Sequence, residues 1–121
     1  MSRATLKDYE AIVNAMNGYI EGNIVGKGEV MKSTFHKDAI MYGYTNDGKL
    51  SEGSIQNLYD LIDTLGPSKD LQYRIDVLDV AVTVAVVRVI LEGPGVEYAD
   101  YHTLLKVDGE WKVISKVFHQ Y

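Results

Sequence analysis

The sequence predicts an α+β fold in which about three helices come first and a series of long antiparallel strands follows. In the first part of the chain, apolar residues recur at three- and four-residue steps, whereas residues 71–119 consist of extended runs rich in β-branched residues. The two patterns are segregated and do not alternate as they do in βαβ units. Because 121 residues is an ordinary length for one domain, we expect residues 1–121 to form a single domain.

Helices are predicted over residues 4–22, 27–35 and 52–65. The apolar stripe of the first helix consists of Leu6, Tyr9, Ile12, Val13, Met16 and Ile20. Gly22 is a stop signal for this helix, and Gly66, followed by a proline, ends the third.

A short strand is predicted at Ala39–Tyr44, and four longer strands follow the third helix. The Asp-Gly dipeptide within residues 45–50 indicates a tight turn after the first strand. A second Asp-Gly pair, Asp108–Gly109, separates two strand-like runs and is a strong hairpin signal. The longer strands are expected over residues 71–80, 82–92, 97–107 and 111–119.

The strand at 82–92 is apolar on both faces, which indicates that both faces of the sheet are covered. Val84, Val86 and Ile90 lie on one side, and Ala85, Val87, Val89 and Leu91 lie on the other. Helices can cover one face, and we expect a second copy of the chain to cover the outer face as a homodimer. The alternative is an outer face that tolerates exposed valines. Arg88 interrupts the side that carries Val84, Val86 and Ile90. It would pair with a carboxylate such as Asp76, with an anionic ligand, or across the dimer interface.

Composition argues against several classes of partner. The net charge is -5 and no basic stripe with interleaved aromatic residues is present, so we expect neither nucleic acid nor a membrane surface as a partner. The longest apolar run, residues 80–87, is far too short to cross a bilayer. The chain has no cysteine and does not start with an apolar leader, so we expect a cytoplasmic location.

The order of elements and two stretches of sequence resemble the NTF2-like superfamily. The stretches YIEGNIVGKGEVMKSTFHKDAIM and DYHTLLKVDGEWKVISKVFH are most similar to its SnoaL-like and putative lumazine-binding group of small bacterial proteins. The resemblance implies a cone-shaped fold in which a curved antiparallel sheet wraps around the helices and leaves a cavity. Members include steroid isomerases, polyketide cyclases, dehydratases, epoxide hydrolases and non-enzymatic binding proteins, so the resemblance specifies the fold and leaves the reaction open.

Asp100 and His102 are the predicted catalytic residues. They are two apart on one predicted strand, so both project from the same face. A carboxylate beside an imidazole can hold its tautomer and raise its basicity. Cyclase-like and dehydratase-like relatives use Asp and His for acid–base work in their pockets, and the resemblance implies that role here. The alternative is a polar face near the rim of the sheet or at the dimer interface.

Three tyrosines are candidate ligand-binding residues. Tyr42 and Tyr44 are two apart on the first strand, and their hydroxyls would donate to a ligand carbonyl or an enolate-like oxygen. The alternative is cross-strand packing with the hydroxyls in water. Tyr19 on the first helix would close the pocket from the helix side, or would be an ordinary core residue.

His36, Lys116 and Phe118 complete the predicted ligand-binding set. His36 would be a pocket acid or base, or a cation at a helix C-terminus. Lys116 shares a side of the last strand with Ile114 and Phe118, and an inward lysine needs a partner such as Asp100 or a ligand carboxylate. The alternative for Lys116 is to reach solvent at the rim.

No metal site and no cofactor are expected, because the histidines are scattered and no phosphate-binding glycine loop is present. With neither a cysteine nor a G-x-S-x-G motif, proton transfer in an apolar cavity is the expected mode of any catalysis. We expect a small-molecule-binding protein with isomerase, cyclase or dehydratase chemistry. The alternatives are a ligand-binding module without turnover and a homodimeric partner protein whose cavity is incidental.

Overall fold

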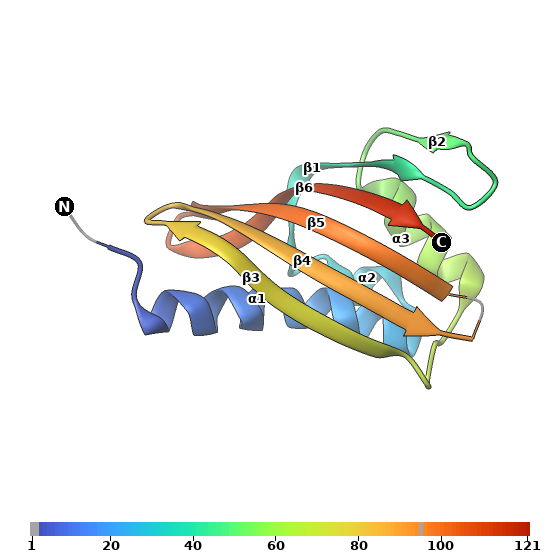
Figure 1. Cartoon of the computed structure of the whole chain (residues 1–121), viewed down its shortest axis with the longest axis horizontal. Coiled ribbons are helices and arrows are strands. Elements are labelled where there is room, and N and C mark those ends of the chain that lie inside the picture. Colours follow the sequence, from blue (N-terminus) through green and yellow to red (C-terminus); the bar gives the residue numbers. More distant parts are fainter. Residues whose placement is uncertain (1–2, 95) are drawn as a thin grey trace.

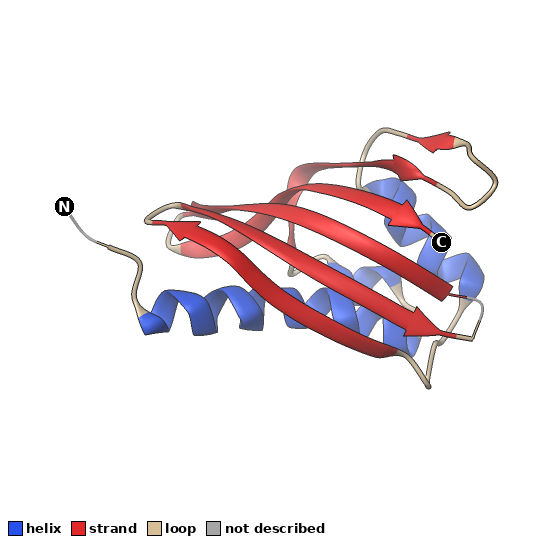
Figure 2. Ribbon diagram, in the orientation of Figure 1, coloured by secondary structure: helices blue, strands red, loops and turns tan. Residues whose placement is uncertain are grey.

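The computed structural model describes residues 3–94 and 96–121 and shows a curved, unclosed six-stranded sheet with helices on one face (Figure 1). The strands follow the spatial order β2-β1-β6-β5-β4-β3. Figure 2 shows the long first helix running behind the sheet, with the other two helices at one end of it. The predicted α+β class, with helices segregated from a meander of strands, is confirmed.

Helix α1 (Leu6–Val25) begins at a capping box and ends at a left-handed glycine. The Thr5 hydroxyl accepts from the backbone N–H of Asp8, and the Asp8 carboxylate accepts from the backbone N–H of Thr5. Gly26 ends the helix with φ of 73°, a value that an L side chain rarely adopts. Helix α3 (Gln56–Leu65) ends before Gly66, as predicted.

Helix α2 (Gly28–Met31) is a single turn, so the helix predicted over 27–35 is wrong in its second half. The reason is Thr34, whose fully buried hydroxyl accepts from the Tyr19 backbone N–H at 2.9 Å and donates to the Ala15 carbonyl at 2.6 Å. Those two backbone groups would pair with each other in an undisturbed helix. These bonds fix the chain after α2 against α1 and end the helical path.

The strands are β1 (Phe35–Tyr44), β2 (Leu50–Ser51), β3 (Gln72–Ala81), β4 (Val84–Gly93), β5 (Val96–Val107) and β6 (Glu110–Gln120). Strands β1, β5 and β6 extend further than the sequence predicts, whereas β3 and β4 are shifted slightly toward the C-terminus. The two-residue strand β2 was not predicted. Strands β1 and β6 pair in parallel, so the sheet is mixed and not purely antiparallel as expected. Turn signals act only between neighbours in sequence, and β1 and β6 are joined through the whole meander, so no local signal fixed their relative direction.

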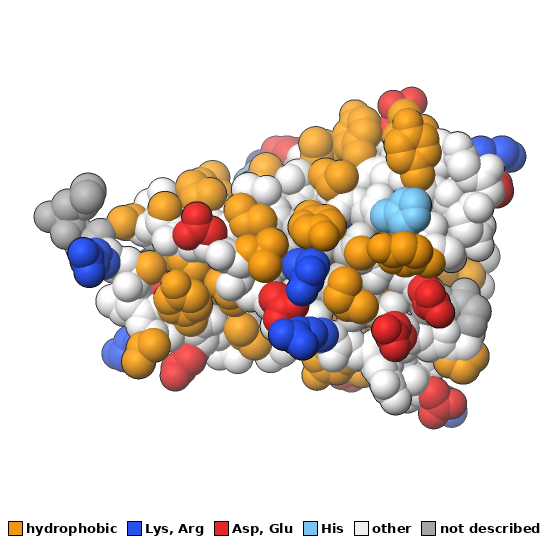
Figure 3. Space-filling model, viewed as in Figure 1, with side chains coloured by type: hydrophobic (Ala, Val, Ile, Leu, Met, Phe, Trp, Pro, Cys, Tyr) orange, Lys and Arg blue, Asp and Glu red, His pale blue; other side chains and the backbone are white. Residues whose placement is uncertain are grey.

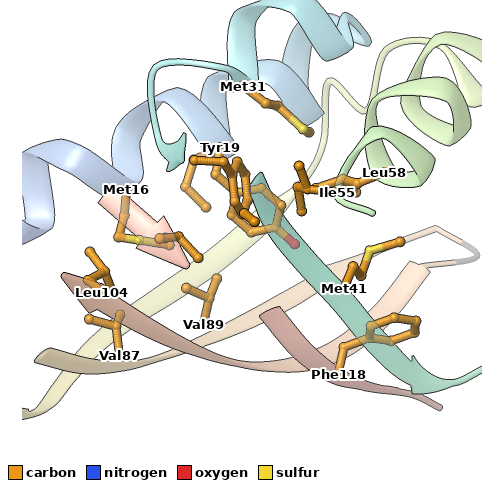
Figure 4. Packing of buried hydrophobic residues seen from close by; sticks show 14 of the residues in the cluster. Met16, Tyr19, Met31, Met41, Ile55, Leu58, Val87, Val89, Leu104 and Phe118 are labelled. Carbon is orange, nitrogen blue, oxygen red and sulfur yellow. The ribbon is translucent and has the colours of Figure 1, made fainter. Parts of the chain in front are cut away.

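The core lies between the helices and the concave face of the sheet (Figure 4). Met16 and Tyr19 of α1 point toward Val87 and Val89 of β4, while Ile55 and Leu58, before and within α3, close the other end. Of the two apolar sides predicted for β4, the one with Ala85, Val87, Val89 and Leu91 faces the core, since all four are buried. Trp111 is buried at the start of β6 and belongs to the same core.

Candidate functional site

A small hollow lies between α1, α3 and the concave face of the sheet. Its volume is about 80 Å³. Apolar side chains from the sheet and α3 supply much of its wall, among them Met41, Leu58, Ile62, Leu91 and Phe118. The polar groups on the wall include Tyr19, Asn23, Tyr98 and Lys116. An apolar hollow with a few polar groups is typical of small-molecule sites, but this one is far smaller than the roughly 300–1,000 Å³ of drug-sized pockets and suits only a small ligand.

Tyr19 links the wall of the hollow to a buried carboxylate. Its hydroxyl donates a short hydrogen bond to Oδ2 of Asp100, which is fully buried on β5 and does not line the hollow. Burial and the charge of Asp100 hold the pKa of Tyr19 well above its usual value, so the phenol stays protonated. The second oxygen of Asp100, Oδ1, has no hydrogen-bond partner within the described residues.

His102 lies beside Asp100 but is not hydrogen-bonded to it. The distance from His102 Nε2 to Asp100 Oδ2 is 3.7 Å, which is longer than a hydrogen bond. The imidazole is fully buried against the rings of Tyr19 and Phe35. Burial lowers the pKa of His102 and outweighs the opposing effect of Asp100, so the ring is held neutral. Like Asp100, it does not line the hollow.

Lys116 is the charged residue on the wall of the hollow, and its side chain is only 3% exposed. Its Nζ lies 3.6 Å from the Met41 sulfur and 4.7 Å from the centre of the Phe118 ring, with Tyr19 and Tyr98 slightly further away. Burial lowers the pKa of Lys116, and the charge of Asp100 opposes that shift only in part.

The charge of Lys116 acts in turn on the pKa of Asp100. Burial alone would raise its pKa, but the positive charge of Lys116 and the contacts with His102 and Tyr19 outweigh burial and lower it. The site therefore favours the ionised form of Asp100 beneath the hollow and disfavours the charged form of Lys116 on its wall, and no direct ion pair joins the two among the described residues.

The strand register brings these residues together. His102 pairs with Lys116, and Lys116 pairs in turn with Met41 of β1. Asp100 pairs with Phe118 one step further along the same face. Side chains on directly paired residues stand close enough to interact, so three strands, β1, β6 and β5, bring Lys116, His102 and Asp100 together on the concave face.

A β-bulge in β6 turns Lys116 inward. Leu104 pairs with Val113 and Thr103 pairs with Ser115, so Ile114 is an extra residue on β6. Before the bulge Trp111 and Val113 are buried, and after it Lys116 and Phe118 are buried. Unbroken alternation from Trp111 would have placed Lys116 on the outer face. Lys116 and Phe118 face inward together, as expected. Ile114, which was expected on the same side, is instead the extra residue of the bulge.

Gly43 makes room for Phe118 in the wall. A Cβ at Gly43 would lie 2.3 Å from the Phe118 carbonyl oxygen and 2.5 Å from a ring carbon. No side chain fits there without displacing the Phe118 ring, so this glycine is required by close approach.

Tyr42 and Tyr44 do not face the hollow. From Ala39 onward the buried residues of β1 are Ala39, Met41 and Gly43, so the alternating Tyr42 and Tyr44 point to the outer face, where they are 39% and 53% exposed. The expectation that they line the pocket is corrected by this register. His36 follows no helix: it lies within β1, half-buried, and its Nδ1 accepts from the Asp38 backbone N–H at 3.0 Å. It is not part of the hollow.

Sequence reasoning missed Tyr98, Asn23 and Met41, all of which line the hollow. Tyr98 precedes Asp100 by two residues and so belongs to the same face of β5, a signal that was available. Asn23 follows Tyr19 by one helical turn, and its side-chain amide donates to the Tyr19 carbonyl at 3.0 Å. Met41 is next to Tyr42 in β1, so the two side chains point to opposite faces. Met41 could be assigned to the hollow only once the buried face of β1 was known.

Arg88 lies on the outer face and pairs there with Asp76, one of the partners that the sequence suggested. The distance from its Nη2 to Asp76 Oδ2 is 2.9 Å, and Arg74 binds the same carboxylate at 2.8 Å. No group of three or more residues suited to holding a metal ion occurs in residues 3–94 and 96–121. None of the helices in the described part of the chain is long and apolar enough to cross a membrane.

Residues 7–119 match the family described as putative lumazine-binding. The chain belongs to this family. Over 119 residues it is 34% identical to the aldolase FrzH of a Cladobotryum species, an alignment that covers 97% of this chain and 94% of that protein. The predicted resemblance to putative lumazine-binding proteins is thereby confirmed, while the SnoaL-like part of that expectation stays a prediction.

Solved structures show the same fold for this putative lumazine-binding protein. An NTF2-like protein from Shewanella baltica has a TM-score of 0.91 at 32% identity, covering 99% of this chain and 98% of the other. One from Methylobacillus flagellatus has a TM-score of 0.91 at 38% identity, covering 98% and 95%. A ketosteroid isomerase-like protein from Erwinia carotovora atroseptica shares the fold alone, with a TM-score of 0.73 at 17% identity over 96% and 98%. The family and fold are those of small-molecule-binding NTF2-like proteins.

Proposed function

We propose that the chain binds a small carbonyl compound in the hollow and catalyses proton transfer at the carbon next to the carbonyl. The observation that carries this proposal is the hydrogen bond from Tyr19, on the wall, to the buried carboxylate of Asp100, with Lys116 on the same wall. Proton removal beside a carbonyl needs a proton acceptor and a donor to the oxygen that becomes negative. The site offers both within one apolar enclosure.

Each polar residue has a distinct part in this proposal. Lys116 contacts the ligand and, when protonated, donates to the carbonyl oxygen, which stabilises the negative charge that develops there. Tyr19 also contacts the ligand, and its oxygen takes the α-proton as its own hydroxyl proton moves to Asp100 along their hydrogen bond. Asp100 and His102 do not line the hollow, so Asp100 accepts the proton only through Tyr19 and His102 acts as a positioning residue, in place of the direct catalysis expected of both.

The aldolase relative supports chemistry of this kind. An aldol reaction begins with proton removal beside a carbonyl, and the same step starts isomerisations and many cyclisations and dehydrations. At 34% identity over nearly the whole chain, the relative supports the class of step and leaves the substrate open.

Exchange of α-protons in heavy water tests the proposal without knowledge of the natural substrate. The protein is incubated with acetone, butanone or cyclopentanone, and loss of the α-proton signals is followed by NMR. Exchange above the buffer rate is expected, falling by about 100-fold or more in Lys116→Met, because acid–base groups typically contribute that much. Lys37→Met is the matched control, since Lys37 is exposed on β1 away from the hollow. Exchange at the buffer rate with all three ketones would contradict the proposal.

A second candidate is ligand binding without turnover. It is favoured by the absence of Asp100 and His102 from the lining, which leaves few titratable groups in contact with a ligand. Binding of lumazine, a small heterocycle with ring carbonyls, can be followed by the quenching of its fluorescence. Saturable binding that Phe118→Trp weakens, together with no α-proton exchange, would favour this candidate over catalysis.

We also propose that the outer sheet face pairs with a second copy of the chain. A row of directly paired residues crosses this face through Tyr42, Val117, Tyr101, Arg88 and Asp76. Figure 3 views the sheet side and shows hydrophobic side chains in several groups over the strands, with basic and acidic side chains between them. Exposed tyrosine and valine beside an arginine–aspartate pair is a composition that suits a protein interface.

A further inference from the structure

Lys116 is placed as a nucleophile would be. Its Nζ reaches the wall of the hollow, and its neighbours are a thioether sulfur at 3.6 Å and three aromatic rings with centres 4.7 to 5.9 Å away. Among the residues that the structure describes, no carboxylate forms an ion pair with it. A structural ammonium group is normally held by carboxylates or carbonyl oxygens, and here neither holds it.

The surroundings favour the unprotonated amine more than water does. Burial disfavours the charged form and lowers the pKa of Lys116, while the buried Asp100 carboxylate offsets only part of that shift. Only the neutral amine has a lone pair to attack a carbonyl carbon, and desolvation in an apolar pocket is one of the ways in which lysines are activated for this attack.

We propose that Lys116 condenses with the carbonyl compound in the hollow to form an imine. This inference rests on the proposed carbonyl ligand and names the residue that would bond to it covalently. The Nζ–C bond forms as the C=O double bond opens, the oxygen takes up the two protons that leave the nitrogen, and water departs as the C=N bond forms. No oxidant or reductant is needed.

The site is suited to the product of that condensation. A protonated imine carries its positive charge where the ammonium group of Lys116 lies, so the rings of Phe118, Tyr19 and Tyr98 and the charge of Asp100 stabilise it in the same way. The positive nitrogen withdraws electrons from the neighbouring carbon and makes its proton easier to remove. Tyr19 can receive that proton on its oxygen as its own hydroxyl proton moves to Asp100 along their hydrogen bond.

Reductive trapping of the wild-type protein tests the imine directly. The protein is mixed with acetone and sodium cyanoborohydride at neutral pH, and modified lysines are located by peptide mass spectrometry. We expect Lys116 to gain one isopropyl group about tenfold more than the exposed Lys37, because a desolvated lysine is the better nucleophile. Labelling of Lys116 at or below the level of Lys37 would overturn the inference.

Lys116→Arg separates the imine from simple charge stabilisation. Arginine keeps the positive charge but cannot condense with a ketone, so α-proton exchange should be lost if the imine is required. Wild-type exchange in a folded Lys116→Arg protein would overturn the imine and leave the proposed proton transfer intact. Trapping at Lys116 without any exchange by the wild type would support the imine and overturn the proton transfer.

Discussion

The hydroxyl of Tyr19 on α1 donates a hydrogen bond to Oδ2 of Asp100 on β5, 81 residues further along the chain. Figure 4 shows Tyr19 between the helices and the sheet, with its hydroxyl pointing toward the strands. This bond joins the helical layer to the sheet through a fully buried carboxylate. Its removal should therefore affect both the stability of the fold and the chemistry proposed for the hollow.

Tyr19→Phe should lower the free energy of unfolding by about 2 kcal/mol, because it leaves a buried charged acceptor without its donor. Urea unfolding followed by circular dichroism measures this loss. Tyr9→Phe on the same helix is the matched control, since Tyr9 is exposed and the change should have almost no effect. Equal stabilities of the two variants would show that the Tyr19 hydroxyl is dispensable.

Thr34→Val should cost about 1–3 kcal/mol, because the buried Thr34 hydroxyl is bonded to the Ala15 carbonyl and the Tyr19 N–H. Valine nearly preserves the shape but can satisfy neither backbone group. Thr64→Val removes a similar bond to a backbone carbonyl on the exposed surface of α3 and should cost much less. A thermal or urea unfolding series decides between them, and similar losses for both variants would contradict this role of Thr34.

Gly43→Ala should destabilise the protein by about 1–3 kcal/mol and displace the Phe118 ring, since the added methyl group lies within 2.5 Å of that ring. Ligand binding in the hollow should weaken at the same time. Gly93→Ala is a control in another strand, where the nearest atom to the added Cβ is 3.6 Å away. If Gly43→Ala were as stable as Gly93→Ala, the contact with Phe118 would not constrain the strand.

Acid should destabilise the fold through His102. The folded protein lowers the pKa of His102 below its ordinary value of 6.5, so below that pH the unfolded chain binds a proton that the folded chain does not. The free energy of unfolding should therefore decrease as the pH falls from about 6.5 toward the lower pKa of the folded state.

The pH series identifies His102 as the cause when it is repeated on variants. His102→Phe keeps a ring beside Tyr19 and Phe35 but cannot be protonated, so its stability should fall less steeply with acid. His119→Phe changes an exposed histidine of β6 and should retain the wild-type slope. The prediction is wrong if both variants keep that slope.

Val117→Lys should convert a dimer to a monomer, because Val117 lies in the middle of the outer face between Tyr42 and Tyr101 and is 49% exposed. Two added ammonium groups would face each other across a two-fold contact. Analytical ultracentrifugation of wild type and variant measures the change. Leu6→Lys at the exposed start of α1 should leave the dimer intact. A monomeric wild type would refute the proposed interface.

Local patterns in the sequence predicted most of the fold. The apolar stripe of α1, the stop at Gly66 and the Asp108–Gly109 hairpin all act between residues close in sequence. The stop and the hairpin are found in the structure, and so is the middle of the stripe, whereas Leu6 and Tyr9 at its start are exposed. The second half of the predicted second helix failed because the Thr34 hydroxyl bonds to a distant helix, a contact with no local signature. Tyr42 and Tyr44 were placed on the wrong face because alternation gives a pattern without saying which side is buried.

The sequence by itself determined the α+β class, the strand that carries Asp100 and His102, and the shared face of that pair. Only the tertiary structure decided that Tyr19 binds Asp100 and that Lys116 lines the hollow. Lys116 faces inward because Ile114 forms a bulge against β5, and a bulge is defined by pairing between strands, which exists only once the sheet has formed. Periodicity along one strand specifies that side chains alternate between two faces, whereas pairing with the neighbouring strand decides which of them face the core.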